Sequence, residues 1–429
     1  MKKRSILVAL LLGTVVALPL DVGARTRAPG DERWVFTSAF QEGCDGVVVA
    51  ASGLALTRST VRTNATKNDG LVTAFDAASG AVVWKARYDG PDHRNDAFTA
   101  LATNATGVFA IGQQSMADGR PWPFAVGIDP ATGSILWTWI GRGWITDVEA
   151  PLGGSVIITG AARTPGAMKD VRVTALDPAT GDPTWETWID HGNDRSLGAV
   201  VSASGDRLFA YAAVDGTSRP GAVTAIDLVD GTVAWDRTYA SFVWLSAVDP
   251  GGARLYGLIG DQVAAFGTTG GRIAWIAPSP GTPTVQDMAT DAAGGLYVAG
   301  SNGSIVVMRF DGATGVRSWR RAHAGGIDLP DSARSIAVDA VTGTVYVTGR
   351  QDLDIYRAVS NDMVTLAIDA ATGAETWAVV RDVPAGQYEE GRVVGLSVTG
   401  DTAVVCGATA DNGWGPESIV IGYDATSGP

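Results

Sequence analysis

Cysteine and histidine are scarce in this 429-residue chain, which has two Cys and three His. Two Cys exclude a disulfide-dense small fold. His93, His191 and His323 fall in the connections that follow three separate copies of the repeat described below, so they do not predict a shared metal site. HExxH, GxSxG and phosphate-cradling glycine motifs are missing as well. The sequence therefore carries no recognisable catalytic motif.

Positive charge is also in short supply. The chain has 32 Lys and Arg against 45 Asp and Glu, a formal net charge of -13 at pH 7. Nucleic acid and anionic membrane surfaces are therefore not expected as partners. Hydrophobic residues make up 46% of the chain, which is too many for a disordered protein. The 55 Gly follow no Gly-X-Y period, so they exclude collagen and predict many tight turns.

Only one long apolar run occurs, and it lies at the N-terminus. A basic start at residues 2–4 precedes an apolar stretch over residues 5–20, and small residues follow at 22–24. This arrangement predicts a signal peptide over residues 1–24 and a single mature domain over residues 25–429. An uncleaved anchor helix is the alternative, although Pro and Asp interrupt the stretch. No transmembrane segment is expected after cleavage.

The signal peptide also predicts where the protein works. Its cleavage point lacks the nearby Cys that a lipid anchor requires. We therefore expect a secreted protein, or a periplasmic one if the host has an outer membrane.

One short pattern recurs eight times along the mature chain. An apolar run leads into Asp-x-x-Thr-Gly, and a second run ending in Trp follows, which predicts a β-hairpin around an Asp-Gly turn. The copies occupy 72–84, 125–137, 173–185, 223–235, 263–275, 307–319, 365–377 and 420–429. Their turn aspartates are Asp76, Asp129, Asp177, Asp227, Asp311, Asp369 and Asp424, with Gly267 in the fifth place.

Another pair of candidate strands precedes each hairpin, as in residues 335–349. Each unit therefore holds four strands, named A to D here, in about 50 residues. Eight such units predict an all-β, eight-bladed β-propeller of four-stranded antiparallel blades. The repeated tryptophans are expected to pack between blades rather than to bind a ligand. They are Trp34, Trp84, Trp137, Trp185, Trp235, Trp275, Trp319 and Trp377.

The two chain ends predict how the ring closes. The eighth hairpin stops before its returning strand, and the segment around Trp34 matches the strand that contains Trp377. The N-terminal segment is therefore expected to supply strand D of the last blade. In the alternative, residues 34–41 form the innermost strand of blade 1, because little chain separates them from a strand B at residues 46–50.

The two cysteines, Cys44 and Cys406, belong to neighbouring blades, 1 and 8. An oxidising compartment favours a disulfide that joins them. The strand assignment, however, puts Cys44 at the start of one strand B and Cys406 near the end of another. This placement predicts a Cα separation beyond bridging distance, so a bond is not the preferred interpretation.

The hairpins LDPATGDPTW and IDAATGAETW resemble the repeat of the pyrroloquinoline-quinone-like propellers, the quinoprotein alcohol-dehydrogenase-like superfamily. The phrase VYVTGR also resembles secreted bacterial β-propeller repeat proteins. The resemblance covers nearly the whole mature chain and implies eight blades. The superfamily includes a non-enzymatic outer-membrane assembly lipoprotein that works as a scaffold. The Cys that anchors that lipoprotein is missing here.

Quinone-dependent members of this superfamily use a vicinal Cys-Cys disulfide, a Glu-Asn-Asp calcium site and an Asp base. No adjacent Cys pair exists here, and no position matches the calcium ligands or the base. We therefore assign no catalytic, cofactor-binding or metal-binding residue. Pyrroloquinoline quinone or Ca²⁺ enters only under the alternative function given below.

Four expected strand-C starts carry a carboxylate: Asp69, Asp170, Asp362 and Glu417. One carboxylate in each blade does not converge on a cation, because calcium needs six or more oxygens. These side chains are expected to accept backbone amide hydrogen bonds from the adjoining loop.

Loop lengths indicate a binding face. The connections from strand B to strand C are expected to be long in blades 1, 2, 3, 7 and 8 and short in blades 5 and 6. In blade 1 the connection is expected to span residues 52–68. They share one face with the D-to-A loops. Exposed aromatic, Met and Arg side chains on this rim are candidate partner contacts. These are Met116, Trp122, Tyr356, Arg357 and Trp414; the alternative is that they pack loop against loop.

The sequence thus predicts an exported, monomeric, non-catalytic propeller that binds a protein or glycan partner through its loop-bearing face. An oxidoreductase, quinone-dependent or with another unfamiliar site, is the alternative. A structural envelope scaffold without a small-molecule ligand is a third possibility.

Overall fold

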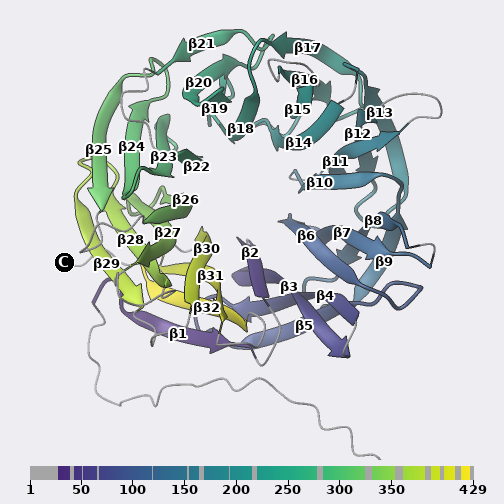
Figure 1. Ribbon diagram of the computed structural model, residues 1–429, viewed down its shortest axis with the longest axis horizontal. Helices are drawn as coiled ribbons and strands as arrows, with labels where there is room; N and C mark the ends of the chain where they lie inside the picture. Colours follow the sequence, from purple (N-terminus) through teal and green to yellow (C-terminus); the bar gives the residue numbers. More distant parts are fainter. Residues whose placement is uncertain are drawn as a thin grey trace, which may run out of the picture.

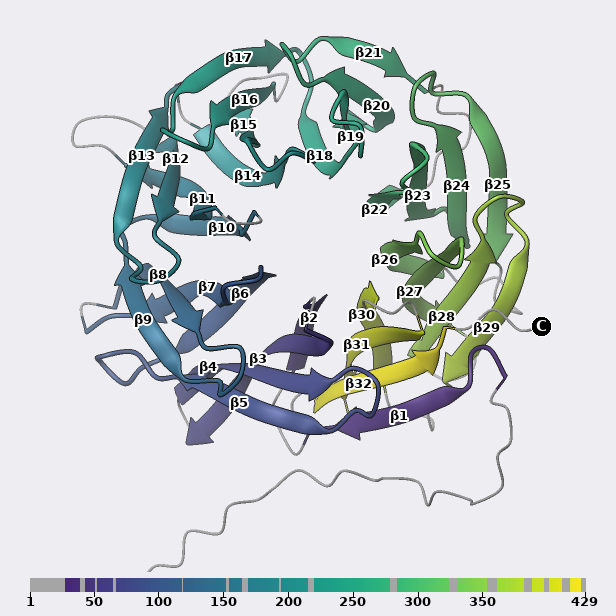
Figure 2. The same cartoon turned by 180° about the vertical axis from the view of Figure 1, so that it is seen from behind.

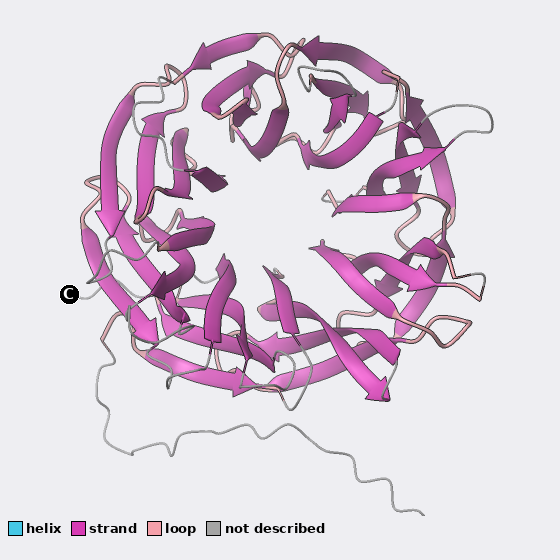
Figure 3. Ribbon diagram, viewed as in Figure 1, coloured by secondary structure: helices cyan, strands magenta, loops and turns pink. Residues whose placement is uncertain are grey.

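A computed structural model describes residues 28–425 apart from 39–42, 51, 65–66, 118, 152–153, 164–168, 193, 215–219, 278–283, 324–330, 353–360, 382–387, 397–400 and 411–416. The predicted signal peptide over residues 1–24 lies outside the described residues. The described part of the chain contains no helix with the length and hydropathy that a membrane span requires. Figure 3 shows strands and loops only.

The strands form eight blades around a ring, as predicted, with strand A innermost and strand D outermost (Figures 1 and 2). Blades 1 to 4 contain β2 (Gly43–Val49), β3 (Leu54–Asn64), β4 (Lys67–Asp76), β5 (Val82–Tyr88); β6 (Asp96–Thr103), β7 (Val108–Ser115), β8 (Pro121–Ile128), β9 (Ile135–Ile140); β10 (Trp144–Glu149), β11 (Val156–Arg163), β12 (Lys169–Leu176), β13 (Pro183–Ile189); and β14 (Asp194–Val201), β15 (Arg207–Val214), β16 (Gly221–Asp227), β17 (Val233–Tyr239). Blades 5 to 8 contain β18 (Val243–Val248), β19 (Arg254–Ile259), β20 (Gln262–Gly267), β21 (Ile273–Ile276); β22 (Thr284–Thr290), β23 (Gly295–Ser301), β24 (Ile305–Asp311), β25 (Arg317–His323); β26 (Ser332–Asp339), β27 (Thr344–Asp352), β28 (Asn361–Asp369), β29 (Glu375–Arg381); and β30 (Tyr388–Leu396), β31 (Thr402–Ala410), β32 (Glu417–Asp424), β1 (Glu32–Thr37).

The hydrophobic core is divided among the blade junctions. Eight clusters of buried side chains occur among the described residues, and each joins two neighbouring blades. Strand C is buried on both faces, as the run of buried residues in β4 shows, whereas the outermost strand β5 alternates between buried and exposed positions. A blade therefore gains most of its stability by packing against its neighbours.

The ring closes through the N-terminal strand, as predicted. β1 pairs antiparallel with β32, and Val35 lies opposite Ile421. In Figure 1 the purple β1 runs along the outside of the yellow blade 8. The alternative, in which residues 34–41 form the innermost strand of blade 1, is wrong, because β2 takes that place. A single parallel bridge between Asn361 and Tyr388 also links blades 7 and 8.

Each repeated indole lies between its own blade and the next. In seven of the eight, the indole Nε1 donates to the carbonyl of the residue after the next turn position, as Trp84 does to Pro130 at 2.9 Å. A Cβ on the turn glycine of the next blade would collide with the ring, 2.7 Å from Trp84 Cε3 at Gly133. The same donation joins Trp34 to Ala77, Trp137 to Pro178, Trp185 to Leu228, Trp235 to Thr268, Trp275 to Gly312 and Trp319 to Ala370.

The turn aspartates organise their hairpins through backbone amides. Asp129 Oδ1 accepts hydrogen bonds from the amides of Ala131 and Thr132. These bonds lower the pKa of Asp129, with the Thr132 amide contributing most. Asp76, Asp177, Asp227, Asp311 and Asp369 accept comparable bonds from their own turns. The Asp-x-x-Thr-Gly motif therefore forms and stabilises the turn of each hairpin.

The disulfide prediction was wrong, because Cys44 and Cys406 are bonded, with Cα atoms 5.9 Å apart. Cys44 lies in β2, which is strand A of blade 1 and not strand B. This shift brings it against β31 of blade 8. The predicted loop over residues 52–68 is likewise mostly strand, since its Thr- and Val-rich sequence extends β3 to Asn64.

Candidate functional site

Four tryptophans and two arginines gather on the loop-bearing face where blade 2 meets blade 3. We name this set the tryptophan-arginine surface: Trp122, Trp139, Trp144, Trp188, Arg142 and Arg172. Trp122 lies at the start of β8, Trp139 at the end of β9 and Arg142 in the loop that follows. Trp144 lies at the start of β10, Arg172 in the first half of β12 and Trp188 at the end of β13. All of these positions lie at the same end of their blades.

Arg172 is the centre of this surface. Its guanidinium lies 5.4 Å from the ring centroid of Trp139 and 5.6 Å from that of Trp188. Strand register produces this contact, because Arg172 in β12 is paired with Trp188 in β13. Arg172 Nε donates to Glu186 Oε2 at 2.8 Å, and its Nη1 donates to the Arg142 carbonyl at 3.2 Å. The side chain is therefore fixed in position before any partner arrives.

The other side chains leave indole surface open to solvent. Trp144 is 45% exposed and Trp188 is 40% exposed. Trp188 donates to Glu186 Oε1 at 2.7 Å, so the carboxylate that pairs with Arg172 also orients this indole. Arg142 lies 5.6 Å from the ring centroid of Trp122, and its side chain belongs to the exposed loop after β9. Exposed aromatic and Arg side chains are typical of protein interfaces.

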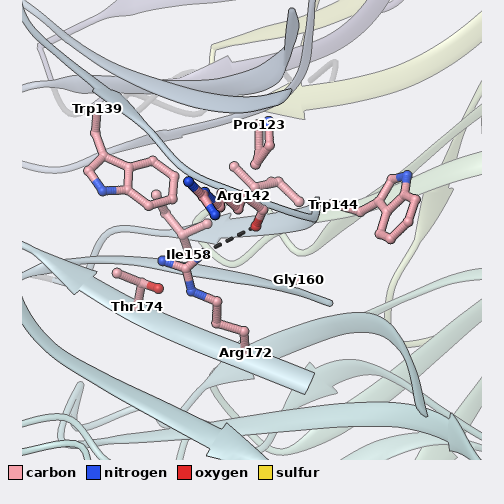
Figure 4. Close-up of a pocket in the computed structure, with 9 residues that line it drawn as sticks. Pro123, Trp139, Arg142, Trp144, Ile158, Gly160, Arg172 and Thr174 are labelled. Atoms are coloured by element: carbon pink, nitrogen blue, oxygen red, sulfur yellow. Dashed lines mark hydrogen bonds between the residues drawn. The ribbon is translucent and has the colours of Figure 1, made fainter. Parts of the chain in front are cut away.

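A shallow recess, open to solvent, lies within the surface. Its walls include Trp139, Trp144, Arg142 and Arg172, and Pro123 also lines it. Figure 4 shows Trp139 and Trp144 on either side of Arg142, and a dashed line joins Arg172 to the Arg142 carbonyl. An open recess of this kind does not enclose a ligand in the way that small-molecule sites usually do.

Only part of the predicted rim is described. Trp122 stacks with Arg142 as stated, and Met116 lies half-buried in the loop after β7. Tyr356, Arg357 and Trp414 lie outside the described residues. The predicted short connections of blades 5 and 6 are present, between Ile259 and Gln262 and between Ser301 and Ile305.

Sequence reasoning missed Trp139, Trp144, Trp188 and both arginines. The sequence did contain a signal for the tryptophans. Only eight of the 14 Trp stand at the repeat position, so the others need another explanation. Of the six others, four fall within residues 122–188. Tryptophans in excess of the repeat were therefore concentrated in blades 2 and 3.

Carboxylates on the innermost strands form a second unpredicted group. Asp147 in β10 accepts the amide of Ala199 in β14 at 3.2 Å, and so ties blade 3 to blade 4. Asp287 in β22 accepts the amide of Ile336 in β26 in the same way. Burial raises the pKa of Asp147 to about 6. Burial, and then the charge of Asp147, raises the pKa of Glu149 to about 8. The contacts of Asp147 and Asp287 are structural.

Comparison with known proteins defines the family and the fold. The family described as outer membrane protein assembly factor BamB matches residues 21–196, 68–243 and 219–379. BamB from Moraxella catarrhalis is 14% identical over 92% of this chain and 99% of its own, with a TM-score of 0.52. Quinohemoprotein alcohol dehydrogenase from Comamonas testosteroni is 13% identical over 93% of this chain and 77% of its own, with a TM-score of 0.57. A europium-containing methanol dehydrogenase is 13% identical over 92% of this chain and 93% of its own, with a TM-score of 0.59. No curated protein matches the chain.

The cysteines do not fit a quinone site of the kind that the sequence resemblance implies. That site needs a disulfide between adjacent cysteines. The two cysteines of this chain are instead bonded to each other between β2 and β31, at a sequence separation of 362. The structural likeness to dehydrogenases therefore shows the shared propeller, and their chemistry does not transfer with it.

Proposed function

This chain belongs to the family of the outer membrane protein assembly factor BamB, and from that premise we propose that it is an exported, non-catalytic binding module for a protein partner. The tryptophan-arginine surface carries this proposal. Its aromatic side chains offer large contact areas, and Arg142 adds positive charge beside the paired Arg172 and Glu186. A polypeptide segment that presents apolar and carboxylate side chains would complement this surface.

The preset geometry supports binding over catalysis. Arg172 is held by Glu186 and by the Arg142 carbonyl, so little side-chain entropy is lost when a partner binds. The recess is shallow and open to solvent, unlike the enclosed pockets of small-molecule sites. The family description, an outer membrane protein assembly factor, favours a protein over a glycan as the partner. Export to the periplasm or beyond accords with the same family.

Site-specific photo-crosslinking in living host cells tests this function. A photoreactive residue replaces Trp144 on the surface, and the control replaces Val341, which is 80% exposed on a turn of blade 7. We expect one defined polypeptide adduct from position 144 and none from position 341. The adduct should be lost when Arg172→Ala is added. Equal adducts at both positions, or no polypeptide adduct at position 144, would contradict the proposal.

A further inference from the structure

Three carboxylates meet on the loop-bearing face where blade 1 joins blade 2. Asp69 lies in β4, Asp89 follows β5, and Asp96 begins β6. The hairpin register brings the first two together, because Gly70 is paired with Tyr88. One oxygen from each of the three side chains lies within 4.8 Å of the others. Three acidic groups at this separation repel one another strongly unless positive charge lies among them.

Asp96 supplies an independent sign of a missing ligand. Its side chain is 1% exposed, and its Oδ2 accepts the amide of Gly90 at 2.6 Å. Its Oδ1 is buried and has no hydrogen-bond partner among the described residues. A buried carboxylate oxygen without a partner is costly, and native structures rarely leave one. Asp96 is one of the three carboxylates that converge at this junction.

The side-chain amide oxygen of Gln114 also lies close to Asp96. Both carboxylate oxygens of Asp96 lie 3.1 Å from the place that a Cβ on Gly90 would occupy, and Gln114 Oε1 lies 2.8 Å from it. Gln114 is 1% exposed, and its Oε1 accepts the Tyr88 hydroxyl at 2.8 Å. A pocket of carboxylate and amide oxygens is the environment that Ca²⁺ prefers.

The nearby protein cations do not neutralise Asp96. Arg87 contacts Asp69 Oδ2 through Nε at 2.5 Å and through Nη2, and its Nη2 also lies 3.8 Å from Asp89 Oδ2. His93 Nδ1 lies 2.9 Å from Asp89 Oδ2. These contacts go to Asp69 and Asp89 and leave Asp96 without an ion pair among the described residues.

The same spacing recurs in the sequence. Asp69, Asp89 and Asp96 are separated by 20 and 7 residues, and Asp362, Asp382 and Glu389 repeat those separations at the junction of blades 7 and 8. The side chains of Asp382 and Glu389 lie outside the described residues. A recurring acidic triad is unexpected if turn geometry alone dictates these positions.

We propose that Asp69, Asp89 and Asp96 bind one calcium-class divalent cation at the junction of blades 1 and 2. Asp96 Oδ1 is the buried anchor, and Asp89, which is 34% exposed at its side chain, opens the site to solvent. Waters complete the six or more ligands that Ca²⁺ takes. This site departs from the sequence-based expectation that no metal is bound and that Asp69 accepts backbone amides. It would tie the D-to-A loop to both blades.

Calorimetric titration of the metal-stripped mature chain with CaCl₂ tests the site. We expect one ion per chain, with a dissociation constant of about 1 mM or tighter, and a melting temperature that rises with Ca²⁺. Asp96→Asn should weaken binding at least about tenfold, since it removes the anchoring charge. Asp89→Asn should do likewise, and its exposed position keeps the test valid if Asp96→Asn fails to fold.

The matched control is Asp261→Asn, a single-charge change on an exposed turn of blade 5. It should leave both the stoichiometry and the affinity unchanged. Absence of heat and of any thermal shift with CaCl₂ would overturn the proposal. So would Ca²⁺ binding that Asp89→Asn weakens no more than Asp261→Asn does, because the ion would then be held elsewhere.

Discussion

The Gly30 amide donates a hydrogen bond to the Asp424 carbonyl at 3.0 Å, although the two residues stand at opposite ends of the chain. In blade 1 the same bond runs from Gly80 to Asp76 at 2.8 Å within one hairpin. Gly30 also takes the usual place of the turn glycine, with φ +87 and its Cα against the ring of Trp377. The last turn of the ring is therefore assembled from both termini.

Removal of residues 25–37 should destabilise the ring severely. This deletion withdraws Trp34 and Phe36, which are 8% and 4% exposed, from the core between blades 8 and 1. Truncating one buried aromatic side chain costs about 3–5 kcal/mol, so we expect a loss of at least about 5 kcal/mol. Thermal unfolding is the measurement, and a chain that lacks only residues 1–24 is the control. An unchanged transition would refute closure by β1.

The Cys44–Cys406 disulfide should stabilise the same junction between blades 8 and 1. Denatured, unreduced protein should therefore contain no titratable thiol. Replacing both cysteines with Ser should lower the free energy of unfolding by about 2–4 kcal/mol, because the bond closes a long loop in the unfolded chain. Two free thiols per chain would show that the bond does not form.

The repeated and the exposed tryptophans should respond differently to truncation. Trp84→Ala removes an indole that is 7% exposed and hydrogen-bonded to the next blade, so it should cost about 3–5 kcal/mol. Trp144→Ala removes one that is 45% exposed and should change stability by about 0.5 kcal/mol or less. Chemical denaturation of both variants gives the comparison. Equal losses would mean that Trp144 is also a packing residue.

Stability should fall as the pH rises through the range in which Glu149 ionises. The folded-state pKa of about 8 lies above the ordinary value of 4.5, so the folded protein holds this proton more tightly than the unfolded chain. The resulting stabilisation is complete below about pH 4.5 and is lost by about pH 8.

Glu149→Gln should therefore reduce the fall in the free energy of unfolding between about pH 4.5 and pH 8. At pH 8 this variant should be more stable than the parent by about 1 kcal/mol or more. Urea unfolding across this pH range measures it. Asp129→Asn is the control, because the pKa of Asp129 is lowered and its effect is confined to acid conditions. Parallel curves for the parent and Glu149→Gln would contradict the assignment.

Local signals made the fold predictable. The turn at Asp76 and the indole of Trp84 lie within one hairpin, and their repetition sets the blade number. The pairing of Cys44 with Cys406 was missed because residues 46–50 were assigned to strand B and residues 52–68 to a loop, whereas β2 is strand A of blade 1 and β3 is its strand B.

The candidate site depended on contacts that no local pattern specifies. Arg172 meets Trp139 across the junction of blades 2 and 3, and a shift of one residue in the register of β12 would turn Arg172 to the other face. Asp69, Asp89 and Asp96 likewise converge only when blades 1 and 2 dock. The sequence revealed that these residues exist, and the structure showed which of them meet.

Incubation of the purified mature chain with pyrroloquinoline quinone and Ca²⁺ tests most directly whether the protein works by binding partners and not by quinone chemistry. After gel filtration, the protein fraction should carry no quinone absorbance and should show no dye-linked alcohol oxidation. Retention of one quinone per chain, with alcohol-dependent dye reduction, would contradict the account.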